Sequence, residues 1–267
     1  IRYDLYKEIG SPKINTLEDY IDVLDKMVKA CPKSDSGKQT YGVSLFPDWD
    51  GDMVMFVKAT AALYGWEEFG FGLYNVNTQE FQDCLSDNSE YLRCLKFYHE
   101  LYKRGLLDPD SSTQTYDNCI EDYTDGAAFF NLFAWMAAVQ YNTPEHLKEG
   151  KAMLAVPAED SKPLVNGTNV YGGNRIFSIG ANTEYPELCM AILNWLSTPE
   201  GTMVSEYGPQ GVTWDYNADG KIEFTELGKK TSKDENTEMT GGYTGTFKDG
   251  RNQMNNRTWA LDAENPD

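Results

Sequence analysis

The chain has 267 residues, of which 40% are hydrophobic, so it can bury a core as one large domain or as two smaller ones. Its formal net charge of −19 argues against a nucleic-acid partner, which would require a basic face, and against electrostatic docking on anionic lipid. No apolar run approaches the length of a membrane span.

Helical and extended patterns alternate through the first half of the chain. Thr16 is expected to cap a helix that runs to Ala30, with Asp19 completing a capping box. Asp52 should begin a second helix that stops at Gly65. Three further elements are predicted in this half: a strand at 40–46, a hairpin at 70–82 and a helix at 88–104.

The second half continues the same alternation. We predict a helix at 117–125, strands at 126–130, 151–156 and 174–179, and a helix at 186–196. In the last of these, apolar residues recur at helical spacing, which predicts a buried face of Leu188, Ile192, Trp195 and Leu196. Helices alternating with short strands predict an α/β fold, with helices packed on a short mixed sheet.

Signatures of catalysis are scarce. The sequence has no G-x-S-x-G, no P-loop and no dinucleotide fingerprint, and neither His99 nor His146 lies in a nucleophile pattern. We therefore expect no enzyme, although 42 acidic residues leave the carboxylate pair of a glycoside hydrolase open. The five cysteines form no C-x-x-C and are interpreted as small buried side chains, with one disulfide left open.

Aromatic residues are the stronger signal, because they make up 13% of the chain. Sugars present apolar C–H faces and hydroxyls, so a sugar site combines aromatic side chains with a few polar partners. Packing in a core or at its rim is the alternative for each aromatic residue. We predict a ligand site from the aromatic residues that lie in or beside polar loops and from their polar neighbours, namely Asp48, Trp49, Asp50, Trp135, Tyr171, Asn174, Arg175 and Trp214.

Residues 215–226 match the calcium-loop template D-x-[DN]-x-[DN]-G-x5-E at every fixed position. Gly220 provides the sharp turn, and Lys221 would contribute its backbone carbonyl. The expected Ca²⁺ ligands are Asp215, Asn217, Asp219, Lys221, Glu223 and Glu226, in a structural rather than catalytic role. The alternative is an Asp-Gly hairpin whose acids are solvated.

Several segments together resemble one family. They are the P-E…N-W-L…P-E-G helix at 186–201, the G-P-Q-G turn at 208–211, Trp214, the D-G-K loop at 219–221, and the start R-Y-D-L-Y-K-E-I-G at 2–10. The G-A-A run at 126–128, with Trp135 shortly after it, belongs to the same pattern. This order resembles the extracellular solute-binding lipoproteins of ABC transporters in Gram-positive bacteria.

The resemblance implies a lobe of the periplasmic-binding-protein-like type II fold at 1–200 and an extension at 201–267 that carries the calcium-type loop. It implies a monomeric, non-catalytic receptor that captures a carbohydrate outside the cell and delivers it to ABC permease subunits. A lipid anchor and an N-terminal lobe are expected upstream, outside this sequence. A peptide ligand and, less favoured, a glycoside hydrolase are the alternatives.

Overall fold

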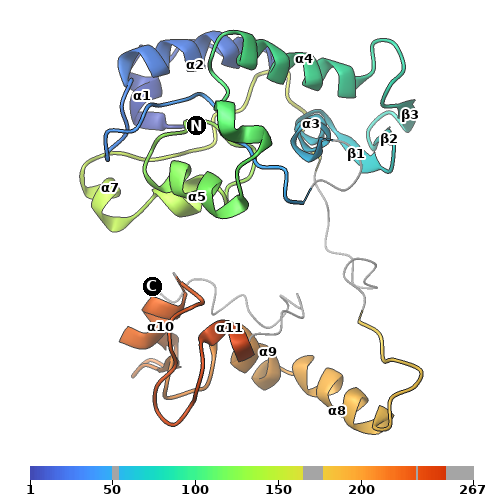
Figure 1. Ribbon diagram of the computed structural model, residues 1–267, viewed down its shortest axis with the longest axis vertical. Helices are drawn as coiled ribbons and strands as arrows, with labels where there is room; N and C mark the ends of the chain where they lie inside the picture. Colours follow the sequence, from blue (N-terminus) through green and yellow to red (C-terminus); the bar gives the residue numbers. More distant parts are fainter. Residues whose placement is uncertain (50–53, 165–176, 233, 251–267) are drawn as a thin grey trace. The chain divides into compact units, whose positions relative to one another are not determined.

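The computed structural model describes residues 1–49, 54–164, 177–232 and 234–250 (Figure 1). The chain divides into two compact units, Ile1–Thr168 and Asn169–Asp267, and each is described by itself. The sequence led us to expect a boundary at residue 200. The observed division places the helix at 186–196 in the second unit, because that helix packs on the one that follows it.

Unit 1 is mainly helical, with one small sheet. Its helices are α1 (Tyr3–Glu8), α2 (Asp19–Ala30), α3 (Met55–Ala61), α4 (Glu90–Lys103), α5 (Tyr116–Thr124), α6 (Ala138–Tyr141) and α7 (Pro144–Lys148), with short 3-10 turns η1 (Ala62–Tyr64) and η2 (Pro109–Ser112). Its strands are β1 (Trp66–Phe69), β2 (Gly72–Asn75) and β3 (Glu80–Asp83). Every helix described in the chain is too short or too polar to cross a lipid bilayer.

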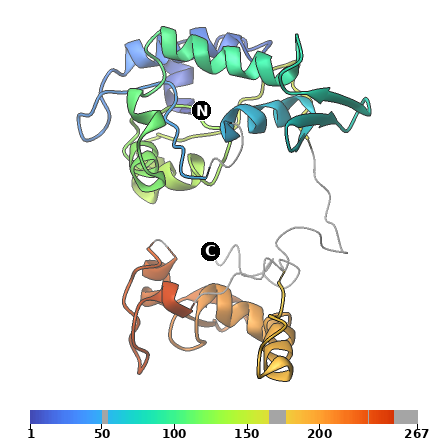
Figure 2. The same ribbon diagram turned by 45° about the vertical axis from the view of Figure 1, so that its right-hand side comes forward.

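The helices α2 and α4 lie side by side along one face of unit 1 (Figures 1 and 2). Both are amphipathic as predicted, and side chains such as Leu24 and Leu101 are fully buried. Arg93 of α4 forms a bidentate ion pair with Glu18, with N–O distances of 2.8 and 2.9 Å. The α2 helix begins two residues later than predicted. The Asp19 carboxylate accepts the Thr16 N–H, as in a capping box, but the first turn makes i→i−3 bonds such as that from the Tyr20 N–H to the Leu17 carbonyl.

The prediction of a strand at 40–46 is wrong. The segment is extended, but it does not form a regular hydrogen-bonded ladder with a neighbouring strand. The Tyr41 N–H donates to the Ala127 carbonyl at 2.8 Å, and the Val43 N–H donates to the Leu106 carbonyl at 3.0 Å. These contacts remain isolated parallel bridges. The Gly42 carbonyl accepts two successive N–H groups, those of Phe129 and Phe130, which interrupts the even spacing of a parallel ladder.

The other predicted strands change in the same way. Segments 126–130 and 151–156 also form single bridges instead of strands, the second through Met153 to Arg2. Residues 177–179 lie in no strand, and the rest of the predicted strand at 174–179 lies outside the described residues. The hairpin prediction at 70–82 is confirmed by β2 and β3, which β1 extends to a three-stranded antiparallel sheet.

The hydroxyl of Tyr123 makes hydrogen bonds with two extended segments of unit 1. The Tyr123 hydroxyl on α5 lies 2.9 Å from both the Ser44 and the Phe130 carbonyl oxygens. Its side chain is fully buried. The hydroxyl also accepts the Ser44 N–H at 3.3 Å, so it serves backbone groups of two segments that have few ladder bonds of their own.

We expect Tyr123→Phe to lower the free energy of unfolding by about 1–3 kcal/mol, because it removes a buried hydroxyl that donates to one backbone carbonyl and accepts the Ser44 N–H. Denaturant unfolding followed by circular dichroism measures this change. Tyr102→Phe is the matched control, since Tyr102 is exposed on α4. Equal stability of the two variants would contradict the role given to Tyr123.

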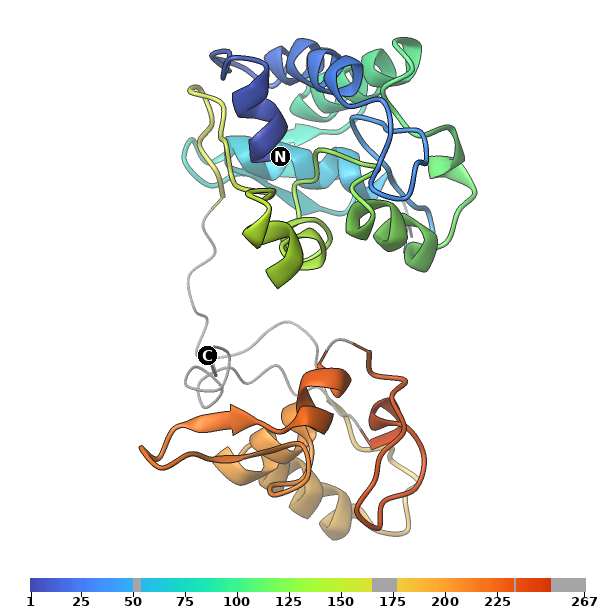
Figure 3. The ribbon, with the colours of Figure 1, turned by 90° about the vertical axis from the view of Figure 1, so that its left-hand side faces the viewer.

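Unit 2 contains α8 (Pro186–Leu196), α9 (Pro199–Tyr207), β4 (Trp214–Tyr216), β5 (Ile222–Phe224), α10 (Glu226–Thr231) and α11 (Phe247–Gly250). Figure 3 shows the β4–β5 hairpin extending away from the helices of this unit. Its small core is formed by Met203 and Trp214, with Tyr207, Ile222 and Phe224 packed against them.

The α8 helix is confirmed, but its predicted buried face is not. Leu196 is the buried residue of this fully described helix, while Leu188, Ile192 and Trp195 are exposed. The assignment of Trp195 to a core is therefore wrong for this unit, in which its side chain is 40% exposed. The physical reason is that α8 packs on α9 near its C-terminal end, which leaves most of its apolar length uncovered within unit 2.

Candidate ligand site

An exposed group of aromatic rings gathers in unit 1 from three separate segments. Trp49 stacks on Tyr116 with ring centroids 4.7 Å apart and on Trp135 with centroids 6.0 Å apart. The Tyr116 and Trp135 centroids are also 6.0 Å apart, so the three rings form a compact triangle with interplanar angles of 25–38°. Trp49 is 53% exposed and Trp135 is 40% exposed. We call these three residues the aromatic triangle.

Core residues support the aromatic triangle from below. Buried Phe46 meets Trp49 edge-on at 5.0 Å and Tyr116 at 5.2 Å, and Phe133 lies 5.5 Å from Trp135. Edge-to-face contacts of this kind are favourable because the positive ring edge meets the negative ring face. The triangle is therefore anchored at one side to the core and open at the other.

Asp48 fixes the position of the loop that carries Trp49. Its Oδ2 atom accepts the backbone N–H of Tyr116 at 2.7 Å, at the first residue of α5. The Thr115 hydroxyl accepts the Asn118 N–H of the same helix end. A carboxylate at a helix N-terminus also interacts favourably with the helix dipole. Asp48 thus holds Trp49 against Tyr116.

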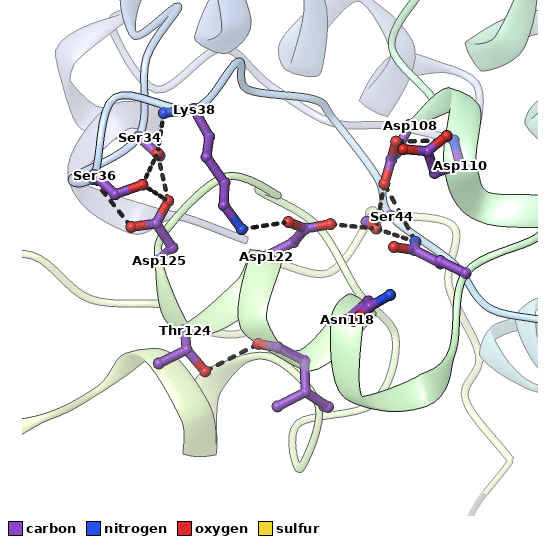
Figure 4. A network of polar contacts seen from close by, with 12 residues as sticks. Ser34, Ser36, Lys38, Ser44, Asp108, Asp110, Asn118, Asp122, Thr124 and Asp125 are labelled. Carbon is purple, nitrogen blue, oxygen red and sulfur yellow. Dashed lines mark hydrogen bonds and ion pairs between the residues drawn. The ribbon is translucent and has the colours of Figure 1, made fainter.

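A polar network binds the segment that precedes Trp49 in the sequence (Figure 4). The Ser44 hydroxyl lies 2.8 Å from Asp108 Oδ2 and 3.1 Å from Asp122 Oδ2. The Gln114 amide donates to Ser44 Oγ at 2.8 Å and to the Leu45 carbonyl at 2.6 Å. Segment 44–45 is thereby bound to α5 and to the turn around η2.

The carboxyl groups of Asp108 and Asp122 share one hydroxyl, that of Ser44. The Ser44 hydroxyl has one proton and can donate to one carboxylate at a time. Burial raises the pKa of the Asp122 carboxyl, and the nearby charge of Asp108 raises it further, while the Ser44 hydrogen bond and Lys38 act in the opposite direction. Each carboxyl group also has a second partner, because Asp122 pairs with Lys38 at 3.5 Å and Asp108 accepts a hydrogen bond from the Gln114 amide at 3.2 Å.

The raised pKa of Asp122 predicts a specific pH dependence of stability. Between its ordinary pKa and the raised one, the folded state binds more protons than the unfolded state, so this group's contribution falls as the pH rises. Asp122→Asn removes that titration. In denaturant titrations, we expect the free energy of unfolding of the variant minus that of the parent to increase from pH 4 to pH 7.

Asp4→Asn is the matched control with the opposite sign. Although partial burial raises the pKa of Asp4, its hydrogen bonds with Arg2 lower it below the ordinary value. Its stabilising contribution is therefore present at neutral pH and lost in acid, so the variant should be most destabilised at pH 7. The same pH trend in both variants would contradict this assignment.

The sequence-predicted ligand residues divide into three groups. Asp48, Trp49 and Trp135 lie together in unit 1, with Asp48 acting on the backbone of α5. Tyr116, which completes the triangle, was not predicted, because it reads as one aromatic residue at a helix start and nothing in its spacing indicates a partner 67 residues earlier, at Trp49. The predicted ligand residues Asp50, Tyr171, Asn174 and Arg175 lie outside the described residues.

Trp214 lies in the core of unit 2. Its side chain is 4% exposed, and its indole N–H donates to the Gly208 carbonyl at 2.7 Å. The structure thus gives Trp214 the packing role that was the alternative in the sequence, and we leave it out of the site proposed below.

Residues 215–226 form the β4–β5 hairpin and the first residue of α10. Asp215 pairs with Glu223 across the strands, and Gly220 makes the turn with a φ of +73°. Asn217 Oδ1 accepts the Asp219 and Lys221 N–H groups at 3.0 Å each. The hairpin therefore matches the alternative that the sequence left open for this segment.

The fit of these residues to calcium is incomplete. Their oxygen donors suit Ca²⁺ chemically, and the sharp turn is present. However, the Lys221 carbonyl accepts the Asn217 N–H at 2.8 Å, and Glu226 pairs with Lys229 at 3.2 Å. Across the described residues, no three His, Cys, Asp or Glu side chains gather closely enough to hold a metal ion.

Three of the cysteines and one histidine pack against their neighbours. All five cysteines are described and free, and Cys84, Cys94 and Cys119 are buried. Burial raises the pKa of the Cys119 thiol to about 12, which keeps it unreactive at neutral pH. The His146 ring stacks on Tyr141 with centroids 4.1 Å apart, and its Nε2 atom lies 3.1 Å from Asp35 Oδ2.

Comparison with known proteins gives one structural relationship. No protein-family model and no curated protein matches the sequence. Among solved structures, the chain is similar to a substrate-binding protein of an S. pneumoniae ABC transporter, FusA, described as an EF-hand mutant in complex with fructo-nystose. The TM-score is 0.55 and the sequence identity 18%, over 85% of this chain and 46% of that one. The likeness supports an α/β fold like that of substrate-binding proteins, and this chain spans less than half of that protein's length.

Proposed function

We propose that this chain is part of a non-catalytic, carbohydrate-binding receptor of an ABC importer. The observation that carries the proposal is the aromatic triangle, in which Trp49 stacks on Tyr116 and on Trp135. Both tryptophans are exposed, and Tyr116 is half-buried against the core. Support for the class comes from the fold shared with a substrate-binding protein whose complex contains an oligosaccharide.

Stacking explains why such a triangle suits a sugar. The C–H faces of a pyranose or furanose ring are apolar, and an indole ring covers them while excluding water. Hydroxyl groups around the sugar ring then need polar partners nearby. Asn131 lies on the same segment as Trp135, but its Oδ1 atom accepts the Phe133 N–H at 2.8 Å and its amide nitrogen donates to Met136 Sδ at 3.7 Å, so its polar atoms already have partners within that segment.

The remaining parts of the proposal follow from the resemblance of the sequence to lipid-anchored solute receptors. The receptor would act outside the cell, as a monomer held by a lipid anchor, and would deliver its ligand to ABC permease subunits. Capture and release involve no covalent chemistry, so the site needs neither a nucleophile nor a general base. Alternatives for the same surface are a peptide ligand and glycoside hydrolysis.

Calorimetric titration of the chain with fructo-nystose and a panel of other oligosaccharides tests the proposal. We expect Trp49→Ala and Trp135→Ala each to weaken binding by about 1–3 kcal/mol, because each removes a stacking ring at the centre of the contact. Tyr102→Ala is the control, an exposed aromatic residue on α4 outside the site.

Three results would contradict the proposal. They are an absence of binding to every sugar at tens of millimolar, an unchanged affinity in both tryptophan variants, and hydrolysis of a chromogenic glycoside that one carboxylate substitution abolishes. A peptide panel run in parallel decides between sugar and peptide, because a peptide receptor would lose peptide affinity in the same two variants.

We also propose that residues 215–226 bind Ca²⁺ through the six residues named from the sequence template. Support comes from the match at every fixed position and from the sharp turn at Gly220. Binding would require Glu226 to leave Lys229 and the carboxylates to turn toward Gly220. The ion would supply a structural cross-link within the hairpin, with no part in a reaction.

If calcium binds the folded hairpin alone, it should raise the melting temperature, and a chelator should reverse the rise. Asp219→Ala should lose the calcium-dependent rise while the metal-free protein keeps its melting temperature. Glu206→Ala, at an acidic residue of α9 outside the loop, should keep the rise. Calorimetry that detects no calcium binding at millimolar metal would leave the segment as an acidic hairpin.

A further inference from the structure

One face of the three-stranded sheet in unit 1 carries exposed aromatic side chains. Antiparallel register aligns Glu67 with Tyr74 and Tyr74 with Phe81, and it aligns Phe69 with Gly72 and Gly72 with Asp83. Because side chains alternate along a strand, these six residues share one face, which we call the outer face. The inner face carries Trp66, Leu73 and Asn75, which are buried against the core.

The aromatic residues of the outer face are strongly exposed. Phe69 is 72% exposed and Phe81 is 59% exposed, and Tyr74 lies opposite Phe81 on the middle strand. The Phe81 ring lies over Gly72, where a Cβ atom would come within 2.3 Å of it. Glycine thus leaves room for the ring to reach Phe69, whose centroid is 6.4 Å away.

The charged residues on the outer face are acidic. Glu67 and Asp83 lie on it, and Glu80 begins β3. The sequence has no lysine, arginine or histidine from Ala59 to Leu92. Lys58, the nearest basic residue in the sequence, is buried and pairs with Glu68 of the inner face at 2.6 Å.

We propose that the outer face docks a protein surface whose apolar side chains are ringed by lysine or arginine. Burial of the phenylalanine rings would stabilise the complex through the hydrophobic effect. The acidic residues Glu67, Glu80 and Asp83, which we call the acidic rim, would attract and orient a basic partner. A sugar fits this face less well, because Phe69 and Phe81 meet at 86° and offer no flat surface for stacking. A second copy of this chain would bring two acidic rims together, which is unfavourable.

The proposal is independent of sugar binding at the aromatic triangle, and a defined probe tests it. The probe is a synthetic amphipathic peptide of leucine and lysine, compared with a leucine and glutamate peptide of equal length. We expect the lysine peptide to bind, to weaken as salt rises, and to shift the NMR signals of Phe69, Tyr74 and Phe81. The glutamate peptide should not bind.

Matched variants test whether the lysine peptide binds the outer face itself or is held only by the overall negative charge of the chain. Phe69→Ser together with Phe81→Ser should weaken lysine-peptide binding at least tenfold while leaving sugar binding unchanged. Tyr102→Ser, at an exposed aromatic residue of α4, should leave peptide binding unchanged. Glu67→Gln with Asp83→Asn keeps the rings and should reduce the salt dependence.

Several outcomes would overturn the proposal. One is that the lysine peptide does not bind at millimolar concentration, and another is that it binds the serine variant and the parent equally. A third is that an oligosaccharide, rather than the peptide, shifts the three aromatic signals. Concentration-dependent dimerisation abolished by Phe81→Ser would instead assign the face to a second copy of the chain.

Discussion

The exposed aromatic site depends on the hydrogen bonds that Tyr123 makes in the interior of unit 1. Its hydroxyl serves the backbone of Ser44 on one segment and of Phe130 on another, and these two segments lead to Trp49 and Trp135. Neither segment belongs to a regular ladder, so side-chain hydrogen bonds replace the missing backbone ones. The position of the aromatic triangle follows from this buried polar connection more than from the sheet.

The two exposed aromatic surfaces of unit 1, the aromatic triangle and the outer face of the sheet, are proposed to bind different kinds of partner. A neutral sugar gains little from a net charge of −19, so the recognition that we propose at the triangle would rest on stacking and hydrogen bonds. The outer face of the β-sheet instead combines exposed rings with an acidic rim, which favours a basic protein partner. Two aromatic surfaces in one unit thus differ in ring geometry and in their polar neighbours.

The sequence was informative where local rules dominate. Helices α4 and α8 and the β2–β3 hairpin were predicted within a few residues, because periodicity, caps and turn residues act over short distances. The isolated bridges were not, since they depend on which distant segments meet. The same limit applied to the site: Trp49 and Trp135 stood out by their loop context, but Tyr116 joined them only through the tertiary fold. On α8, periodicity correctly indicated a helix and could not indicate what covers it.

The central claim is that the aromatic triangle binds an oligosaccharide, and the indole N–H signals of Trp49 and Trp135 test it most directly. NMR titration of the chain with fructo-nystose should move both signals along one saturable curve, while the signal of buried Trp214 stays in place. Saturable shifts confined to other tryptophans, with Trp49 and Trp135 unmoved, would contradict the account.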